Sequence, residues 1–259
     1  MQKSVLDFSM DFFRLDGKVA IITGGNTNLG MAYAVAFAKA GADLYIPHFL
    51  PDVSEVREAV ESEGRRIEFF QGDLTDAEYR KALIADCIEK YGKIDILVNN
   101  AGMGIFAPFE EYKDEDFSRI IDLMLKAVYY LGREVGLVMK EQGGGKIINI
   151  GSVLSYVSDR DCPGYVVAKH GVLGITQDFA NELGKYNIQC NALCPGFFKS
   201  DVNAGVPQEI RDRVSAQLPN GEWGEFGQLM GTAVFLASRA SDYVNGEDIC
   251  VDGGFMAVI

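Results

Sequence analysis

The sequence predicts an α/β protein of one domain, with a doubly wound parallel sheet of seven strands and helices on both faces. Short apolar runs alternate with amphipathic stretches almost from start to finish. The runs are rich in Val, Ile and Leu with little polar alternation, as expected for strands buried on both faces. No repeat, low-complexity run or linker divides the 259 residues, and a chain that is 48% hydrophobic can bury one large core.

The elements follow in order from this pattern. Strands are expected at 18–23, 42–46, 66–70, 94–99, 146–150, 188–194 and 248–251. Between them, apolar residues recur at helical spacing. Helices are expected at 30–40, 53–63, 76–91, 115–140, 164–186 and 225–240. Regular strand–helix alternation indicates a parallel sheet whose helices cover both faces.

Two regions lie outside this alternation. The first is 1–14, where Phe8, Phe12 and Phe13 are expected to pack on the body or at a subunit interface. The second is 197–219, which follows the sixth strand and contains a helical pattern at 207–217. Ligands of such sheets bind beyond the carboxyl ends of the strands, so this insertion is expected to form a substrate lid. The alternative is an ordinary surface excursion.

Charge and composition exclude several classes of protein. The net charge is −13, with 24 Lys and Arg against 37 Asp and Glu. Phosphate neutralisation needs clustered cations, so nucleic-acid and anionic-membrane binding are not expected. The longest apolar stretch, 31–38, is far shorter than the roughly 20 residues of a membrane span, and 1–16 lacks the apolar core of a signal peptide.

Cysteine usage predicts a reduced, cytoplasmic protein. The five cysteines are odd in number and scattered, and none forms a C-x-x-C pair. This pattern argues against a metal site or a disulfide framework. The cysteines are Cys87, Cys162, Cys190, Cys194 and Cys250.

A glycine-rich turn follows the first expected strand. It reads Thr23-Gly24-Gly25-Asn26-Thr27-Asn28-Leu29-Gly30 and opens directly into a helix. Glycines permit a tight turn and close backbone approach, and a helix N-terminus favours a pyrophosphate. The alternative is a strand–helix turn that binds no ligand.

Further polar residues follow the other strands. Asp73 follows the third strand, and Asn99-Asn100-Ala101-Gly102 ends the fourth. Ser152 follows the fifth strand, 13 residues before Tyr165. Tyr165 and Lys169 are four residues apart in a helical pattern and therefore share a face.

The sequence resembles the classical short-chain dehydrogenase/reductase family from 17–19 to 251–254. The T-G-x3-G-x-G, N-N-A-G, S…Y-x3-K and Pro195-Gly196 elements occur in the family's order and spacing. The resemblance implies a Rossmann fold, a nicotinamide cofactor and hydride transfer between an alcohol and a ketone. It also implies a homotetramer built on helix pairs that include 115–140 and 164–186.

The resemblance implies a catalytic role for Ser152, Tyr165 and Lys169. A tyrosine hydroxyl titrates near ~10, so a neighbouring ammonium would help it to exchange protons near neutrality. Tyr165 would be the general acid and base, and Lys169 would lower its pKa and hold the nicotinamide ribose. Ser152 would hydrogen-bond the substrate oxygen.

The resemblance also implies a set of cofactor contacts. Asp73 and Leu74 would meet the adenine, Asn100 and Ala101 the adenosine ribose, and Phe198 and Ser200 the carboxamide end. Lys199 and Phe197 would begin the lid. The remaining expected contacts are Gly24, Asn26, Asn28, Leu29, Gly30, His48, Gly102, Tyr165, Lys169, Pro195 and Gly196.

The end of the second strand favours NAD(H) over NADP(H). An Asp there would accept from a 2′-hydroxyl and an Arg would pair a 2′-phosphate, but the sequence reads Ile46-Pro47-His48-Phe49. The next basic residue is Arg57, and Thr27 stands where NADP-preferring relatives often carry a basic residue. His48 either contacts the ribose or serves only in capping and packing.

Two residues depart from the family pattern. Asn28 replaces the second glycine of the motif; asparagine tolerates left-handed backbone geometry, although its side chain would crowd the pyrophosphate. Met124 stands where the family usually places an asparagine that positions a proton-relay water. A thioether has no donor and is a weak acceptor, so slow turnover or a relay through water and backbone is expected.

The substrate pocket allows two interpretations. Arg160, between Asp159 and Asp161, would pair the carboxylate of a sugar acid, as in the gluconate 5-dehydrogenase and 2-deoxygluconate 3-dehydrogenase branch that the chain resembles. Alternatively, Arg160 pairs its acidic neighbours. The second interpretation of the pocket does not involve Arg160: an apolar slot binds a steroid or a similar ketone. Its residues are Met103, Leu154, Val157, Phe197 and Phe198.

A function of a different class is a dinucleotide-sensing protein that has lost catalysis. Asn28 and Met124 motivate this alternative, whereas the intact Ser152, Tyr165 and Lys169 argue for an NAD-dependent enzyme acting on a small alcohol or ketone.

Overall fold

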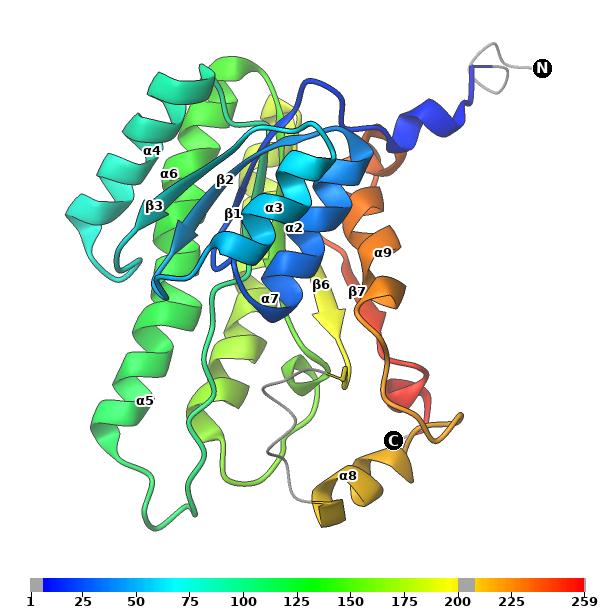
Figure 1. The fold of residues 1–259 in the computed structure, drawn as a ribbon. Helices are drawn as coiled ribbons and strands as arrows, with labels where there is room; N and C mark the ends of the chain where they lie inside the picture. The colour runs from blue at the N-terminus through cyan, green and yellow to red at the C-terminus, as the bar shows by residue number, and fades with distance from the viewer. Residues whose placement is uncertain (1–6, 200–207, 259) are drawn as a thin grey trace.

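The computed structural model describes residues 7–199 and 208–258 and contains the expected parallel sheet (Figure 1). The sheet has seven strands in the order β3-β2-β1-β4-β5-β6-β7, and each pair of neighbours runs parallel. The strands are β1 (Val19–Ile22), β2 (Asp43–His48), β3 (Ile67–Gln71), β4 (Ile96–Asn99), β5 (Gly145–Ile150), β6 (Ile188–Pro195) and β7 (Asp248–Val251). The predicted fold class is confirmed.

Helices cover both faces of the sheet, and each face has its own apolar cluster (Figure 1). One cluster is built on α2 (Asn28–Ala40), α3 (Ser54–Ser62) and α9 (Gly227–Ala237). The other is built on α4 (Ala77–Tyr91), α6 (Ala127–Gln142) and α7 (Pro163–Leu183). The five inner strands are almost fully buried, which explains their continuous apolar sequences, whereas the edge strands β3 and β7 are mostly half-buried.

The remaining elements are short. They are α5 (Asp114–Ile121), α8 (Gln208–Ser215), η1 (Met10–Phe13), η2 (Asp122–Lys126), η3 (Val153–Ser155), η4 (Gly184–Tyr186), η6 (Arg239–Ser241) and η7 (Phe255–Ala257). Two of the three leading phenylalanines pack on the body as expected: the ring of Phe13 lies 6.4 Å from that of Phe235, and the guanidinium of Arg239 lies over Phe12. Phe8 is 64% exposed. None of the described helices is long and apolar enough to cross a membrane.

The long helix expected at 115–140 contains an irregularity that its sequence pattern does not reveal. Between α5 and α6 the backbone forms the π-helical turn η2, in which the Ala127 N–H donates to the Asp122 carbonyl, five residues back. A π-turn inserts a residue into the helical repeat and shifts the faces of the two flanking helices relative to each other. Met124 lies in this turn and is buried.

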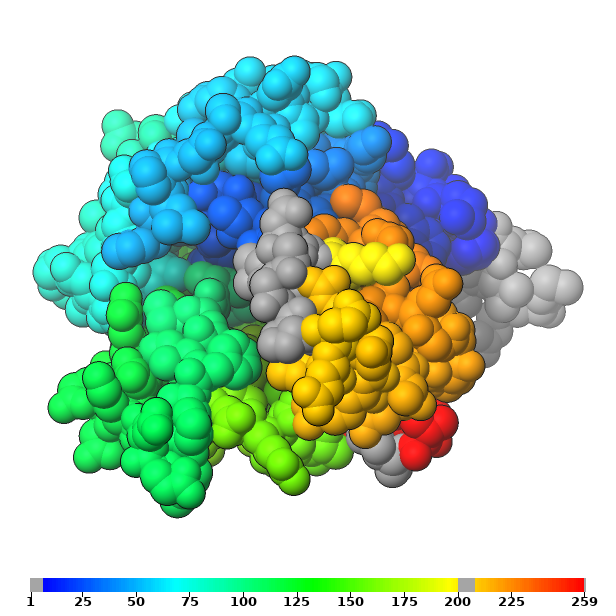
Figure 2. Space-filling view, turned by 60° about the horizontal axis from the view of Figure 1, so that its bottom comes forward, coloured from blue at the N-terminus to red at the C-terminus, as the bar shows by residue number. Residues whose placement is uncertain are grey.

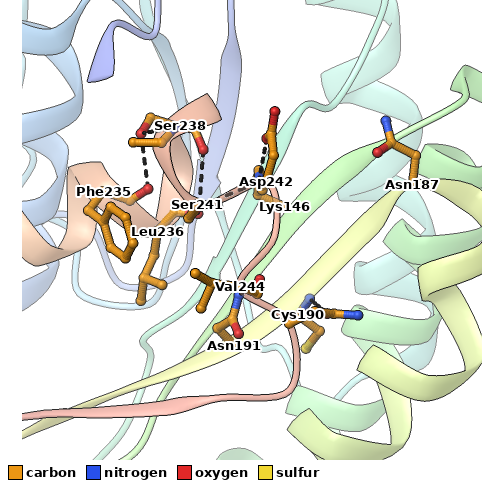
Figure 3. Close-up of polar contacts among 12 residues, drawn as sticks. Lys146, Asn187, Cys190, Asn191, Phe235, Leu236, Ser238, Ser241, Asp242 and Val244 are labelled. Carbon is orange, nitrogen blue, oxygen red and sulfur yellow. Dashed lines mark hydrogen bonds and ion pairs between the residues drawn. The ribbon is translucent and has the colours of Figure 1, made fainter. Parts of the chain in front are cut away.

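A polar network fixes the connection from α9 to β7 near the amino-terminal end of β5 (Figure 3). The ammonium of Lys146 lies 2.9 Å from an Asp242 carboxylate oxygen and 3.4 Å from the Ser241 hydroxyl. The Asn191 side-chain amide donates to the Val244 carbonyl at 2.8 Å. Burial lowers the pKa of Lys146, and the Asp242 carboxylate opposes that shift. Through its contacts with Ser241 and Asp242, the Lys146 ammonium joins the start of β5 to the segment before β7.

The order of the strands determines where a ligand can bind. β1 pairs with β2 on one side and with β4 on the other, so the chain winds outward in two directions from this point. The connections after β1 and β4 leave toward opposite faces and open a crevice beyond the carboxyl ends of the strands.

Candidate active site

A cleft of about 1110 Å³ opens beyond the carboxyl ends of the strands. Figure 2 views this end of the molecule, with the blue-to-cyan residues of the first third above the green residues around α5. Ser200 lies outside the described residues; every other catalytic and cofactor-binding residue predicted from the sequence lines the cleft. These residues are Gly24, Asn26, Asn28, Leu29, Gly30, His48, Asp73, Leu74, Asn100, Ala101, Gly102, Ser152, Tyr165, Lys169, Pro195, Gly196 and Phe198.

The glycine-rich turn connects β1 to α2 and is tied to the end of β4. The Thr23 hydroxyl accepts the backbone N–H groups of Asn100 and Ala101, each at 2.9 Å. The Asn100 side-chain amide donates back to the Thr23 carbonyl at 2.9 Å. A Cβ atom at Gly30 would collide with the Gly24 carbonyl oxygen, so glycine is required for α2 to start this close to the turn.

Asn28 adopts the left-handed conformation expected of it. Its φ is 47°, in a region that non-glycine residues rarely occupy and that asparagine tolerates better than most. The turn therefore keeps its shape without the second glycine of the motif.

The three catalytic candidates converge from two elements. Ser152 follows β5, and its hydroxyl accepts the Leu154 N–H at 3.1 Å at the start of η3. Tyr165 and Lys169 lie on α7, where the Lys169 ammonium is 5.6 Å from the centre of the Tyr165 ring. Lys169 is 5% exposed and donates to the Ile150 carbonyl at 2.6 Å, which fixes the ammonium beside the end of β5.

Burial shifts both titratable groups toward their neutral forms. It raises the pKa of Tyr165, while a hydrogen bond from Ser152 opposes that shift. It lowers the pKa of Lys169 to about 8. A phenol with a raised pKa holds its proton as a donor, and an ammonium that is still protonated at neutral pH can stabilise the phenolate formed after donation.

The residues of the cleft fit a nicotinamide dinucleotide. The turn brings backbone and the N-terminus of α2 to one wall, as a pyrophosphate needs. The cleft exceeds the usual upper limit of roughly 1,000 Å³ for small-ligand pockets, as an extended ligand requires. When bound, the nicotinamide supplies or accepts a hydride. Among residues 7–199 and 208–258, no cluster of His, Cys, Asp and Glu is arranged to hold a metal ion.

His48, at the end of β2, lines the cleft. Its ring Nδ1 lies 2.8 Å from the Leu50 carbonyl, which can only accept, so Nδ1 carries the proton. In the neutral ring Nε2 is then an acceptor, suited to a ribose hydroxyl. Arg57 does not line the cleft; its guanidinium lies over the Phe69 ring and pairs with Glu61.

Met124 occupies the place expected of an asparagine and forms a contact of its own. Its sulfur accepts the Met103 N–H at 3.4 Å, and the residue is 2% exposed. A thioether therefore holds the segment that follows β4, where Met103 and Gly104 also line the cleft.

The structure separates the residues of both substrate-pocket interpretations from one another or from the cleft. Arg160 is exposed and does not line the cleft, and Asp159 pairs with Arg213 of α8 at 3.3 Å. The expected apolar slot is divided between two places. Met103 and Phe198 line the cleft, whereas the other three residues pack against a separate cluster of Val153, Val214, Leu218 and Phe255. These three residues are Leu154, Val157 and Phe197.

The wall of the cleft that α5 forms was not predicted from the sequence. Polar residues on one face of α5 and at the start of η2 line it, together with Phe226 before α9. Helical spacing groups them on a polar face, but only the fold shows that this face meets the cleft rather than open solvent. They are Asp114, Glu115, Ser118, Arg119 and Asp122.

Comparisons with known proteins agree with this architecture over nearly the whole chain. A family model described as enoyl-(acyl carrier protein) reductase matches residues 24–256. The uncharacterized oxidoreductase YgcW of Escherichia coli (strain K12) is 43% identical over 256 residues, covering 98% of both chains. The 2-dehydro-3-deoxy-D-gluconate 5-dehydrogenase of Dickeya dadantii (strain 3937) is 40% identical over 255 residues, covering 96% of this chain and 99% of the relative.

A solved structure extends the agreement to three dimensions. The gluconate 5-dehydrogenase from Burkholderia cenocepacia J2315, crystallised with NADP and tartrate, is similar to this chain with a TM-score of 0.91 at 33% identity. The match covers 96% of this chain and 99% of that one. Because the agreement extends well beyond the short motifs, the chain belongs to the short-chain dehydrogenase/reductase family of nicotinamide-dependent oxidoreductases.

Proposed function

We propose that this protein is an NAD(H)-dependent dehydrogenase that interconverts a secondary alcohol and a ketone on a sugar acid. The observation that carries the proposal is the convergence of Ser152, Tyr165 and Lys169 in a cleft that fits a dinucleotide. The substrate class is supported by relatives whose names are 2-dehydro-3-deoxy-D-gluconate 5-dehydrogenase and gluconate 5-dehydrogenase.

In the proposed reduction, the chain's own residues bind the substrate oxygen and move one proton. Ser152 donates a hydrogen bond to the carbonyl oxygen and fixes its position. Tyr165 gives its phenolic proton to that oxygen as negative charge develops there. The Lys169 ammonium stabilises the resulting phenolate, and oxidation runs the same proton path in reverse.

The preference for NAD(H) follows from the surroundings of His48. A 2′-phosphate needs a cationic partner, and residues 46–50 contain no Lys or Arg. Two observations favour NADP(H): Arg119 lines the cleft, and similar structures were solved with bound NADP. Arg119 lies on α5, however, and not at the end of β2, where the 2′ position is read.

The test follows NADH and NADPH oxidation with the purified protein and a panel of keto sugar acids, neutral keto sugars and steroid ketones. We expect turnover of keto sugar acids with at least tenfold higher kcat/KM for NADH. Tyr165→Phe should lose that turnover by a factor of about 10² to 10⁴, the usual contribution of a general acid, and still bind NADH.

Other results would change the proposal. Equal use of both cofactors, or a preference for NADPH, would overturn the cofactor assignment. Turnover of steroid ketones alone would replace the substrate class. NADH binding without turnover of any substrate would support the sensor alternative.

Assembly and location belong to the same proposal. We infer a cytoplasmic homotetramer, supported by apolar side chains that α6 and α7 leave exposed; Leu137 is 53% and Val167 47% exposed. Light scattering coupled to size-exclusion chromatography would give the mass of the assembly. A monomeric protein would contradict this inference.

A further inference from the structure

We infer that Arg80, a buried arginine on α4, is a positioning residue that sets the adenine wall of the cleft. The inference depends on dinucleotide binding as assigned above, but no motif of the sequence analysis includes Arg80. Its side chain does not line the cleft; it acts through the backbone of the segment between β3 and α4.

That backbone segment forms part of the cleft wall, because Gly72, Asp73, Leu74 and Thr75 all line it. On the side of Asp73 the segment is held locally. One Asp73 carboxylate oxygen accepts both the Thr75 N–H and the Thr75 hydroxyl, each at 2.8 Å. The Gly72 N–H also donates to the His48 carbonyl at 2.9 Å, which joins this wall to the end of β2.

Arg80 holds the same segment from behind. One nitrogen of its guanidinium donates to the Leu74 carbonyl at 2.8 Å and to the Thr75 carbonyl at 3.1 Å. These are the carbonyls of two consecutive residues in the wall. A charged donor shared between them fixes the orientation of both peptide groups, and a planar, rigid guanidinium does this more firmly than a flexible ammonium would.

Arg80 is itself held by α6, so the wall is linked to the body of the protein. The Arg80 Nε faces a Glu134 carboxylate oxygen at 3.5 Å, and the guanidinium carbon lies 5.0 Å from the centre of the Tyr130 ring. Arg80 is 4% exposed. Burying an arginine costs desolvation energy that a leucine or methionine would avoid. The bonds to two carbonyls of the cleft wall are what an apolar side chain at this position could not form.

The test compares two arginines with similar contacts in different places. Arg66 donates to the Lys90 carbonyl at 3.3 Å and lies over the Tyr91 ring, so it also bonds a carbonyl and stacks on a tyrosine. It does so at the far end of α4, away from the cleft wall. Arg66 is exposed whereas Arg80 is buried, so Arg66→Met controls for the loss of a carbonyl bond and a ring contact, but not for the removal of a buried charge.

We expect Arg80→Met to raise the Kd of NADH, measured by fluorescence titration, about tenfold, a change of about 1.4 kcal/mol. The inhibition constant of AMP, which carries only the adenosine half, should rise by the same factor. That of nicotinamide mononucleotide should stay within twofold. At saturating NADH, kcat should be unchanged, and Arg66→Met should leave all four quantities unchanged.

Two further variants keep the test decisive if Arg80→Met does not fold. Arg80→Lys keeps a positive charge near Glu134 without the planar group, and we expect a smaller but measurable rise in the AMP inhibition constant. Glu134→Gln leaves the carbonyl bonds intact and should change NADH affinity less than twofold. If folded Arg80 variants lose thermal stability but bind NADH and AMP as the wild type does, Arg80 is merely structural and the inference is wrong. If the wild-type protein binds neither NADH nor NADPH, the proposed function fails instead.

Discussion

At Asn28, the backbone conformation rather than the side chain determines whether the glycine-rich turn can form. The turn requires a left-handed residue at this position, and Asn28 supplies it with φ of 47°. Asparagine is less strained in this region than other non-glycine residues, because its short polar side chain can form hydrogen bonds with nearby backbone groups.

Substitutions at Asn28 should separate backbone strain from side-chain crowding. We expect Asn28→Ala to lower the free energy of unfolding by about 1 kcal/mol, since alanine is strained in the left-handed region. Asn28→Gly should be as stable as wild type or more so, and should bind NADH more tightly because the side chain no longer crowds the pyrophosphate. Urea unfolding and NADH titration measure the two effects. Equal stability of the alanine and glycine variants would show that the turn relaxes without strain.

Lys169, to which we assign a catalytic role, is deeply buried, so its protonation affects the stability of the folded protein. The pKa of the buried ammonium is about 8, below its usual 10.5. Between these values the unfolded chain binds more protons than the folded one, so the contribution of Lys169 to folding improves as the pH rises through this window.

A pH series of unfolding experiments tests this directly. Relative to Lys169→Met, the wild-type protein should gain about 2 to 3 kcal/mol of unfolding free energy between pH 7 and pH 10, because the cost of burying the ammonium disappears. Using the difference between the two proteins cancels the titration of all other groups. A difference independent of pH would mean that Lys169 keeps its ordinary pKa in the folded protein.

At the scale of elements, the π-turn η2 is the feature that most distinguishes the cleft wall from a regular helix. It lies between α5 and α6 and carries Met124 into the interior, against the Met103 N–H. The helix that leads into this turn lines the cleft, and the helix that follows it holds Arg80 through Glu134. The irregular turn therefore lies between a helix that lines the cleft and a helix that contacts Arg80 behind the cleft wall.

Replacing Met124 tests whether the missing asparagine limits turnover. If proton transfer is slow without it, Met124→Asn should raise kcat severalfold and reduce the solvent deuterium isotope effect. Met124→Leu, which keeps the apolar volume but removes the sulfur acceptor, is the control and should not raise kcat. An unchanged kcat and isotope effect in Met124→Asn would mean that the relay does not limit the reaction.

At the scale of the whole molecule, the cleft joins parts of the chain that are distant in sequence. Its walls come from the turn after β1, the ends of β2 to β6, α5 and the approach to α9. A ligand that contacts all of these binds only the folded state, so it stabilises the whole protein by mass action.

Ligand-dependent unfolding therefore reports cofactor choice independently of turnover. At a concentration 100 times its Kd, NADH should add about 2.7 kcal/mol to the free energy of unfolding. NADPH at the same concentration, if it binds ten times more weakly, should add only about 1.4 kcal/mol. Denaturant titrations with each cofactor measure this difference. Equal stabilisation would contradict the NAD(H) preference without reference to any substrate.

The sequence alone determined the fold class, the strand order along the chain and most of the cleft. Strands buried on both faces carry continuous apolar runs, and a glycine-rich turn between a strand and a helix is a contiguous motif, so both signals are local. The same is true of Asn28, whose left-handed conformation follows from residue type and motif position. The assignment of Arg160 to a substrate carboxylate lacked such a local signal, and the structure leaves that residue exposed outside the cleft.

Only the tertiary structure decided the features that depend on packing between distant segments. The π-turn interrupts a helix whose sequence pattern is continuous, because its position depends on how α5 and α6 meet the rest of the protein. The polar face of α5 lines the cleft, and Asp159 forms an ion pair with Arg213 of α8. Arg80 is a further case: its bonds to the Leu74 and Thr75 carbonyls are local, but its contact with Glu134 exists only once α4 and α6 have packed together.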